Sequence, residues 1–211
     1  MSRLRPFRST DLFAFNAVNL DHFTETYSCS YYLNYLALWP ELCFLAETPH
    51  AAQLSSSSTS TSTSTPTPTP TAYLIGKAEG TRKELHGHVT AITVSPHYRR
   101  LGLAKSLMSL LESASSSLYS AWFVDLFVRP SNALAVGLYE ALEYGVYRRV
   151  REYYAGGGGK GGAEDEDGFD MRKALPRDTK RETIRPSEKG IKTFVDVHAT
   201  IFEPTYRLSP R

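Results

Sequence analysis

A glycine preceded by two arginines stands between a predicted strand and a predicted helix. This turn reads Arg99, Arg100, Leu101, Gly102, Leu103, Ala104. The residues before it alternate in polarity like a strand, and those after it repeat leucine every four positions. The first N–H groups of a helix have no partner inside the helix, and the helix dipole favours an anion there. Gly102 has no Cβ to keep a ligand away. The pattern therefore predicts a site for a diphosphate.

The same residues carry a family resemblance. Arg99-x-x-Gly102-x-Ala104 resembles the acetyl-CoA signature of GNAT acetyltransferases, which is Gln or Arg, two residues, Gly, one residue, then Gly or Ala. From Leu4 to about Asp178 the chain also resembles the catalytic subunits of NatB N-terminal acetyltransferases, apart from one insertion. The segments that carry this second resemblance are 20–21, 24–27, 35–37, 76–80, 86–91, 124–129, 152–154 and 170–175.

The resemblance implies a cofactor site. Acetyl-CoA would be the acetyl donor, with direct transfer in a ternary complex and no metal. Its diphosphate would lie on the amides of Arg100 to Ala104, with charge added by Arg99 and Arg100. Ile92 and Val94 belong to the strand that, in the family, pairs its backbone with the pantetheine arm. Solvated surface charge is the alternative for the two arginines.

Three side chains are candidates for proton transfer. Tyr139 aligns with the GNAT tyrosine that is placed near the cofactor sulfur as general acid, and Asn132 matches the family asparagine that contacts the cofactor. A core aromatic at helical spacing is the alternative for Tyr139. Because an α-amino group has a pKa near 8, a modest base suffices. Glu25 and His88 are the candidate bases.

The resemblance also implies the substrate: nascent chains beginning Met-Asp, Met-Glu, Met-Asn or Met-Gln. His88 suits a second residue of this kind, because imidazole can hydrogen-bond both carboxylate and amide. Thr90 shares its strand face by the period of two. A structural hydrogen bond is the alternative for the histidine.

Two expected walls flank the peptide groove. Glu25 and Tyr27 lie in the loop between the first two helices, and Tyr153 and Tyr154 end a later strand. In the family these places border the substrate, and two closed walls would admit a chain terminus but not an internal lysine. Ordinary core tyrosines are the alternative.

The composition is that of one domain with tails. The chain has 211 residues and a net charge of +2, too small to indicate nucleic acid by itself. We assign 1–178 to the acetyltransferase domain, 49–71 to a disordered Ser/Thr/Pro insertion and 179–211 to a tail. Cys29 and Cys43 have no metal-site spacing, and no apolar run has the length of a signal or a membrane span. A cytoplasmic protein is expected.

The order of predicted elements is β-α-α-β-β-β-α-β-α-β-β. It matches the GNAT fold, a mixed, mostly antiparallel α/β sheet flanked by helices and splayed at the fourth and fifth strands. A further strand is conceivable within 191–202. The expected strands are 4–7, 42–47, 72–79, 88–94, 121–128, 145–154 and 169–175, and the expected helices are 11–18, 31–39, 103–114 and 132–142.

The family works as a heterodimer with a large helical auxiliary subunit that anchors it at the ribosome. We expect the aromatic helix 31–39, with Tyr32 and Tyr35, to form part of that contact; the alternative is that these aromatics belong to the core.

Three other functions stay open: a GNAT enzyme for lysines or small amines, a non-catalytic interaction protein on a GNAT scaffold, and a nucleic-acid-binding module. One departure from the family is Glu143, which stands where a glycine is usual after the helix. It predicts either a strained turn or a shifted helix cap, with Gly145 as a substitute for the glycine.

Overall fold

The computed structural model describes residues 2–19, 26–48, 68–154 and 165–197. The chain forms two compact units, Met1–Lys77 with Val89–Ser115, and Ala78–His88 with Ser116–Arg211. Strand β4 (His86–Val94) contributes residues to both units. No helix in the described ranges is both long and apolar enough to cross a membrane.

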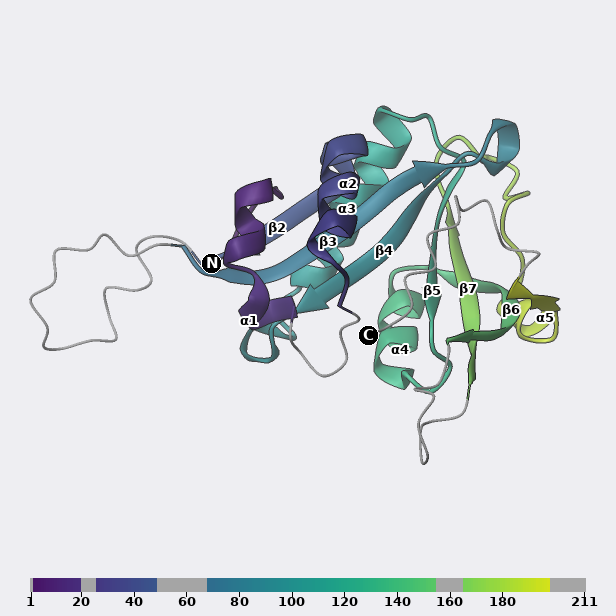
Figure 1. Ribbon diagram of the computed structural model, residues 1–211. Helices are drawn as coiled ribbons and strands as arrows, with labels where there is room; N and C mark the ends of the chain where they lie inside the picture. Colours follow the sequence, from purple (N-terminus) through teal and green to yellow (C-terminus); the bar gives the residue numbers. More distant parts are fainter. Residues whose placement is uncertain (1, 20–25, 49–67, 155–164, 198–211) are drawn as a thin grey trace, which may run out of the picture. The chain divides into compact units, whose positions relative to one another are not determined.

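The first unit contains the strand order β1-β2-β3-β4. Strand β2 (Cys43–Glu47) pairs antiparallel with both β1 (Arg3–Pro6) and β3 (Pro70–Glu79). Helix α2 lies on one face of these strands and α3 behind them (Figure 1). The helical elements of this unit are η1 (Ser9–Phe13), α1 (Asn16–Asn19), α2 (Cys29–Leu38), η2 (Pro40–Leu42), η5 (Pro96–Tyr98) and α3 (Leu103–Ser117).

Aromatic side chains fill the core between α2 and the strands. Tyr32 is 2% exposed and Tyr35 is 8% exposed. They pack in one cluster with residues of β1–β3 and the first helices, namely Phe7, Phe15, Val18, Cys43, Leu45, Tyr73 and Ile75. The prediction that Tyr32 and Tyr35 form a docking surface is therefore wrong, because both rings are needed to fill this core.

The first predicted helix differs in form. A 3₁₀ helix, η1, begins at Ser9 after an N-cap at Arg8, and the short α1 follows. Asp11 ties the start of η1 to its neighbours: its carboxylate accepts from the Arg8 backbone N–H at 2.8 Å and from the Arg5 guanidinium at 2.7 Å. Arg5 also donates to Glu47 at 2.8 Å, so one arginine ties β1, η1 and β2 together.

In the second unit, the strands after β4 are ordered β5-β7-β6-β8 in the sheet. Strand β7 pairs antiparallel with β5 and with β6, and β8 pairs parallel with β6. The predicted element order is confirmed, with boundaries shifted by a few residues. The elements of this unit are η4 (Arg82–Glu84), β5 (Phe123–Val128), α4 (Ala133–Ala141), β6 (Gly145–Tyr154), β7 (Glu166–Ala174), α5 (Ser187–Ile191) and β8 (Phe194–Asp196).

Two predicted loops are shorter than expected at their ends. Strand β3 begins at Pro70, inside the predicted insertion 49–71, and β7 begins at Glu166, before the expected start of the strand 169–175. Residues 49–67 and 155–164 lie outside the described residues.

The segment after Pro176 is more ordered than the extended tail expected from its sequence. It forms α5 and β8, so the possible strand within 191–202 is confirmed at Phe194–Asp196. Gly190 allows α5 to approach β6, since a Cβ there would lie 1.7 Å from the carbonyl oxygen of Val146. No larger residue fits without moving one of the two elements.

Candidate active site

The glycine turn of the first unit has the predicted form. Gly102 has φ +80° and Arg100 has φ +65°, and α3 begins at Leu103. The first intrahelical bond runs from the Ser106 N–H to the Gly102 carbonyl at 3.0 Å. The N–H groups of Leu103, Ala104 and Lys105 therefore precede the helical ladder and are available to an anion.

The surroundings of this turn are open. Apart from Gly102 itself and its two neighbours in the chain, no heavy atom of the described residues lies within 4 Å of the Cβ position at Gly102. Leu101 is 68% exposed, and Arg99 and Arg100 are exposed as well. The Arg99 Nε donates to the Val94 carbonyl at 3.0 Å, which holds the side chain against its own turn. An open turn with positive charge beside unpaired amides fits a diphosphate.

On β4, which precedes this turn in the chain, Thr90, Ile92 and Val94 are half-buried. Thr90 Oγ1 donates to the Tyr35 hydroxyl at 3.2 Å. Tyr35 also accepts from Tyr31, whose ring stacks on Tyr27 at 4.3 Å between centroids. Two predicted substrate residues, Thr90 and Tyr27, are thus linked through α2. Glu25 lies outside the described residues.

His88 belongs to a buried charged cluster in the second unit. Its Nδ1 lies 2.8 Å from Asp125 Oδ1. The other oxygen of Asp125 lies 3.5 Å from Nε2 of His86, and the same nitrogen is 3.4 Å from Glu79 Oε1. Nδ1 of His86 faces the Glu84 carbonyl at 2.6 Å. Both histidines and Asp125 are at most 6% exposed.

The charges of this cluster shift the pKa values of its members. Burial by itself would lower the pKa of His86, but the Asp125 carboxylate, Glu79 and the Glu84 carbonyl raise it to about 9. Burial would likewise raise the pKa of Asp125, yet the nearby charges of His86, His88 and Arg172 hold it well below its usual range. A buried ion pair of His86 and Asp125 follows.

Aromatic contacts connect His88 to the end of β6. The ring of Phe127 lies 5.8 Å from His88 and stacks on Tyr153 at 4.4 Å. Tyr153 meets Tyr154 edge to face at 4.9 Å, and the Arg129 guanidinium lies 4.2 Å from the Tyr154 ring. The structure thereby brings His88, Tyr153 and Tyr154 together, with Phe127 between them.

Tyr139 lies on α4 and is 7% exposed. Burial raises its pKa to about 12, so the hydroxyl keeps its proton at neutral pH and has one to give. Asn132 is the N-cap of the same helix, where its side-chain oxygen accepts from the Ala135 N–H at 3.2 Å. Asn132 therefore lies just before α4, whereas the expected helix 132–142 included it.

The prediction of strain at Glu143 is confirmed. The residue follows α4 with φ +70°, the left-handed conformation that the family's glycine adopts without cost. Its side chain is exposed and lies 3.9 Å from Lys173, a contact that contributes little.

Sequence reasoning missed Asp125, His86 and Phe127 as members of the site. One signal could have found Asp125: it is a lone carboxylate in an otherwise apolar strand, and such a buried charge needs partners. Phe127 follows two residues later on the same strand face.

The site and the fold together define an acyltransferase class. The sequence pattern described as the acetyltransferase (GNAT) family matches residues 20–144, and the chain belongs to this family. Its sheet and flanking helices form the GNAT fold, as in the solved structures described next.

Three proteins are similar to this chain over most of its length. The N-terminal acetyltransferase B complex catalytic subunit naa20 of Schizosaccharomyces pombe is 50% identical over 192 residues, with 91% of this chain and 96% of that protein covered. The corresponding Arabidopsis thaliana subunit is 45% identical, with 90% and 95% covered. The crystal structure of Chaetomium thermophilum Naa20 with a bisubstrate analogue has a TM-score of 0.77 at 38% identity, with 92% of this chain and 96% of that chain covered.

Proposed function

We propose that this chain is the catalytic subunit of a NatB-type N-terminal acetyltransferase. It transfers the acetyl group of acetyl-CoA to the α-amine of nascent chains that begin Met-Asp, Met-Glu, Met-Asn or Met-Gln. The observation that carries the proposal is the open glycine turn at Gly102, with three helix amides ahead of the first helical bond. The identity of 50% to a NatB catalytic subunit supports the same reaction.

The turn suits acetyl-CoA as the acetyl donor. The amides of Leu103, Ala104 and Lys105 would hold the diphosphate, with Arg99 and Arg100 adding positive charge. Ile92 and Val94 are the proposed backbone partners of the pantetheine arm. When bound, acetyl-CoA supplies the thioester carbon that the substrate amine attacks.

Two protons move in this reaction. The attacking amine loses one, for which His88 and Glu25 are the proposed acceptors, directly or through water. The departing thiolate gains one, and the Tyr139 hydroxyl is the proposed donor because its raised pKa keeps it protonated. Asn132 is proposed to contact the cofactor beside it. The protons balance, and no covalent enzyme intermediate is needed.

Selectivity is assigned to the proposed substrate-binding residues. His88 would meet the second side chain, with Thr90 two residues along the same strand. Tyr27 and Tyr153 would flank the methionine with their rings while hydroxyls such as that of Tyr154 bond the peptide backbone. Glu25 is the remaining residue of the proposed substrate-binding set.

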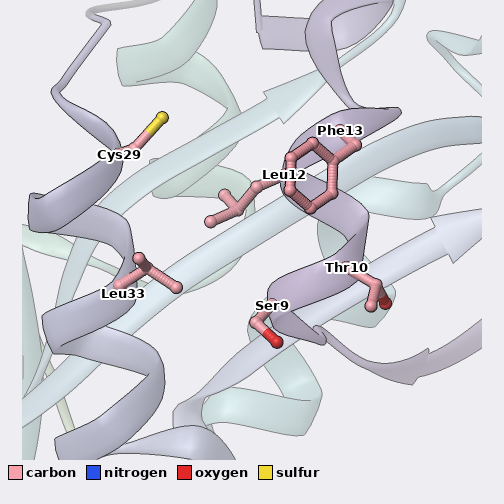
Figure 2. A pocket seen from close by; sticks show the side chains of 6 residues that line it. All are labelled: Ser9, Thr10, Leu12, Phe13, Cys29 and Leu33. Carbon is pink, nitrogen blue, oxygen red and sulfur yellow. The ribbon is translucent and has the colours of Figure 1, made fainter.

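A groove in the first unit suits a partner protein. It has a volume of about 320 Å³ and is lined by residues of η1 and α2, namely Ser9, Thr10, Leu12, Phe13, Cys29 and Leu33. Leu12 and Leu33 point toward one another across it (Figure 2). Phe13 is 90% exposed and Leu33 is 44% exposed. We assign this groove to the auxiliary subunit of a heterodimer, which would hold the chain at cytoplasmic ribosomes.

The docking assignment is tested by co-purification with the auxiliary subunit. Phe13→Asp and Leu33→Asp place a charge in the groove and should weaken the complex by tenfold or more. Leu118→Asp is the matched control, because Leu118 is 63% exposed just after α3. If the groove variants retain the partner as well as the control does, the assignment is wrong.

Thiol release from acetyl-CoA tests the function itself. The complex with the auxiliary subunit is offered peptides beginning Met-Asp, Met-Glu, Met-Asn and Met-Gln, together with Met-Leu and an amino-terminally blocked lysine peptide. Activity should be confined to the first four. Preference for the lysine peptide would indicate a GNAT enzyme of another specificity, and acetyl-CoA binding without turnover would indicate a non-catalytic scaffold.

A further inference from the structure

We propose that the Asp125 carboxylate fixes the proton of the neutral His88 ring on Nδ1, so that Nε2 only accepts a hydrogen bond. Amide second residues of the substrate are then bound by the neutral ring, and acidic second residues are bound by the imidazolium. This proposal rests on the assignment of His88 to the substrate's second side chain.

The first step is the charge state of His86. Its Nδ1 faces the Glu84 carbonyl oxygen at 2.6 Å, and its Nε2 lies between Glu79 Oε1 at 3.4 Å and Asp125 Oδ2 at 3.5 Å. All three neighbours are acceptors. Nε2 makes no hydrogen bond of its own with the described residues. Two carboxylate oxygens lie within 3.5 Å of it, and their negative charge favours the doubly protonated ring, so His86 is a buried cation.

The second step is the charge state of Asp125. His86 lies against one of its oxygens, and Arg172 stands opposite it in the β5–β7 register. These cations keep the carboxylate ionised, and an ionised carboxylate only accepts hydrogen bonds. The other charged groups around the cluster are Glu79 on β3, Glu84 near Arg172 at 3.8 Å, and Asp170, which binds Arg172 at 3.2 Å and Arg148 at 2.7 Å.

The third step concerns His88. Since Asp125 Oδ1 only accepts, the nitrogen 2.8 Å from it, Nδ1 of His88, carries the proton. A neutral imidazole has one N–H, so Nε2 then holds a lone pair. This nitrogen accepts from the NH₂ of Asn or Gln. It bonds a carboxylate only after gaining a proton of its own, which comes from solvent.

The consequence is a selectivity that depends on pH. Acidic second residues require the imidazolium and amide second residues require the neutral ring. The ratio of kcat/KM for Met-Asp over Met-Asn peptides therefore follows the ratio of the two forms, and it should fall about tenfold for each pH unit as the pH rises from about 6 to about 8.5. Taking the ratio of the two kcat/KM values cancels pH effects that are common to both peptides, such as deprotonation of the substrate amine.

Two variants separate this role from a structural one. In Asp125→Asn, the amide can turn its NH₂ toward Nδ1, so neutral His88 can adopt the Nε2–H form and donate to a carboxylate. The ratio should then vary less than threefold over the same pH range. In His88→Gln, the side-chain amide both donates and accepts without titrating. This variant leaves the buried pair of His86 and Asp125 in place and should also flatten the ratio.

The measurement is steady-state thiol release by the complex with its auxiliary subunit, with ¹⁵N NMR of the full chain as a second readout. In the wild type, the neutral form of His88 should carry its proton on Nδ1. An Nε2–H form, a ratio that is flat with pH in the wild type, or an unchanged pH slope in folded His88→Gln would each overturn the proposal. Absence of activity on all four NatB-type peptides would instead refute the proposed function.

Discussion

The protonation of His86 makes the stability of this chain depend on pH in the alkaline range. The folded-state pKa of His86 is about 9 and its ordinary value is 6.5. A raised pKa contributes stability that is fully present below pH 6.5 and is lost as the pH rises through about 9. At about 1.4 kcal/mol for each pKa unit, the loss amounts to about 3 kcal/mol. That is a large part of the 5 to 15 kcal/mol typical of a domain's free energy of unfolding.

The assay is denaturant unfolding of the full chain at a series of pH values from about 6 to about 9.5. His86→Asn replaces the titrating ring with an amide that can still donate to the Glu84 carbonyl. The variant should be less stable than the wild type at pH 6 and should lose most of the slope between pH 6.5 and 9. His97→Asn is the matched control, because His97 is exposed in η5. If His86→Asn retains the wild-type slope, the buried imidazolium does not exist.

Substitutions at three further positions test other parts of the structure. Tyr139→Phe keeps the ring and removes the acidic proton, so kcat should fall about a hundredfold with the KM for acetyl-CoA nearly unchanged; unchanged turnover would refute the acid role. Glu143→Gly relieves the left-handed strain and should raise the free energy of unfolding by about 1 kcal/mol, whereas Glu143→Ala should not, as measured by thermal and denaturant unfolding. Gly190→Ala places a methyl group against Val146, which should destabilise the chain by about 1–3 kcal/mol and increase hydrogen exchange in β8; a neutral result would mean that α5 does not pack on β6 in solution.

Local patterns were sufficient to predict most of the elements. Strand 145–154 has the predicted boundaries, and α3 begins at Leu103 as the glycine turn indicated. The strain at Glu143 was also predictable, because the need for φ > 0 after a helix is a local property of the chain. These features depend on neighbours within a few residues.

Features that depend on distant partners were not predictable in the same way. The start of η1 is held by an ion pair with β1, and the burial of Tyr32 and Tyr35 follows from strands that cover α2. A helix with aromatics on several faces does not indicate by itself which face is covered.

The charged cluster within the site was unpredictable for the same reason, because its members are distant in the sequence. Asp125 and His88 are 37 residues apart, and only the arrangement of β4 and β5 brings them to 2.8 Å. The motif containing His86 and His88 identified the right strand. It could not show that one histidine is a buried cation and the other is oriented by a carboxylate.

A crystal structure of the full chain with bound acetyl-CoA tests the central claim most directly. The diphosphate oxygens should accept hydrogen bonds from the amides of Leu103, Ala104 and Lys105 at the turn of Gly102. A diphosphate bound elsewhere, or a turn filled by the side chains of Arg99 and Arg100, would contradict the assignment of this chain as an acetyl-CoA-dependent enzyme.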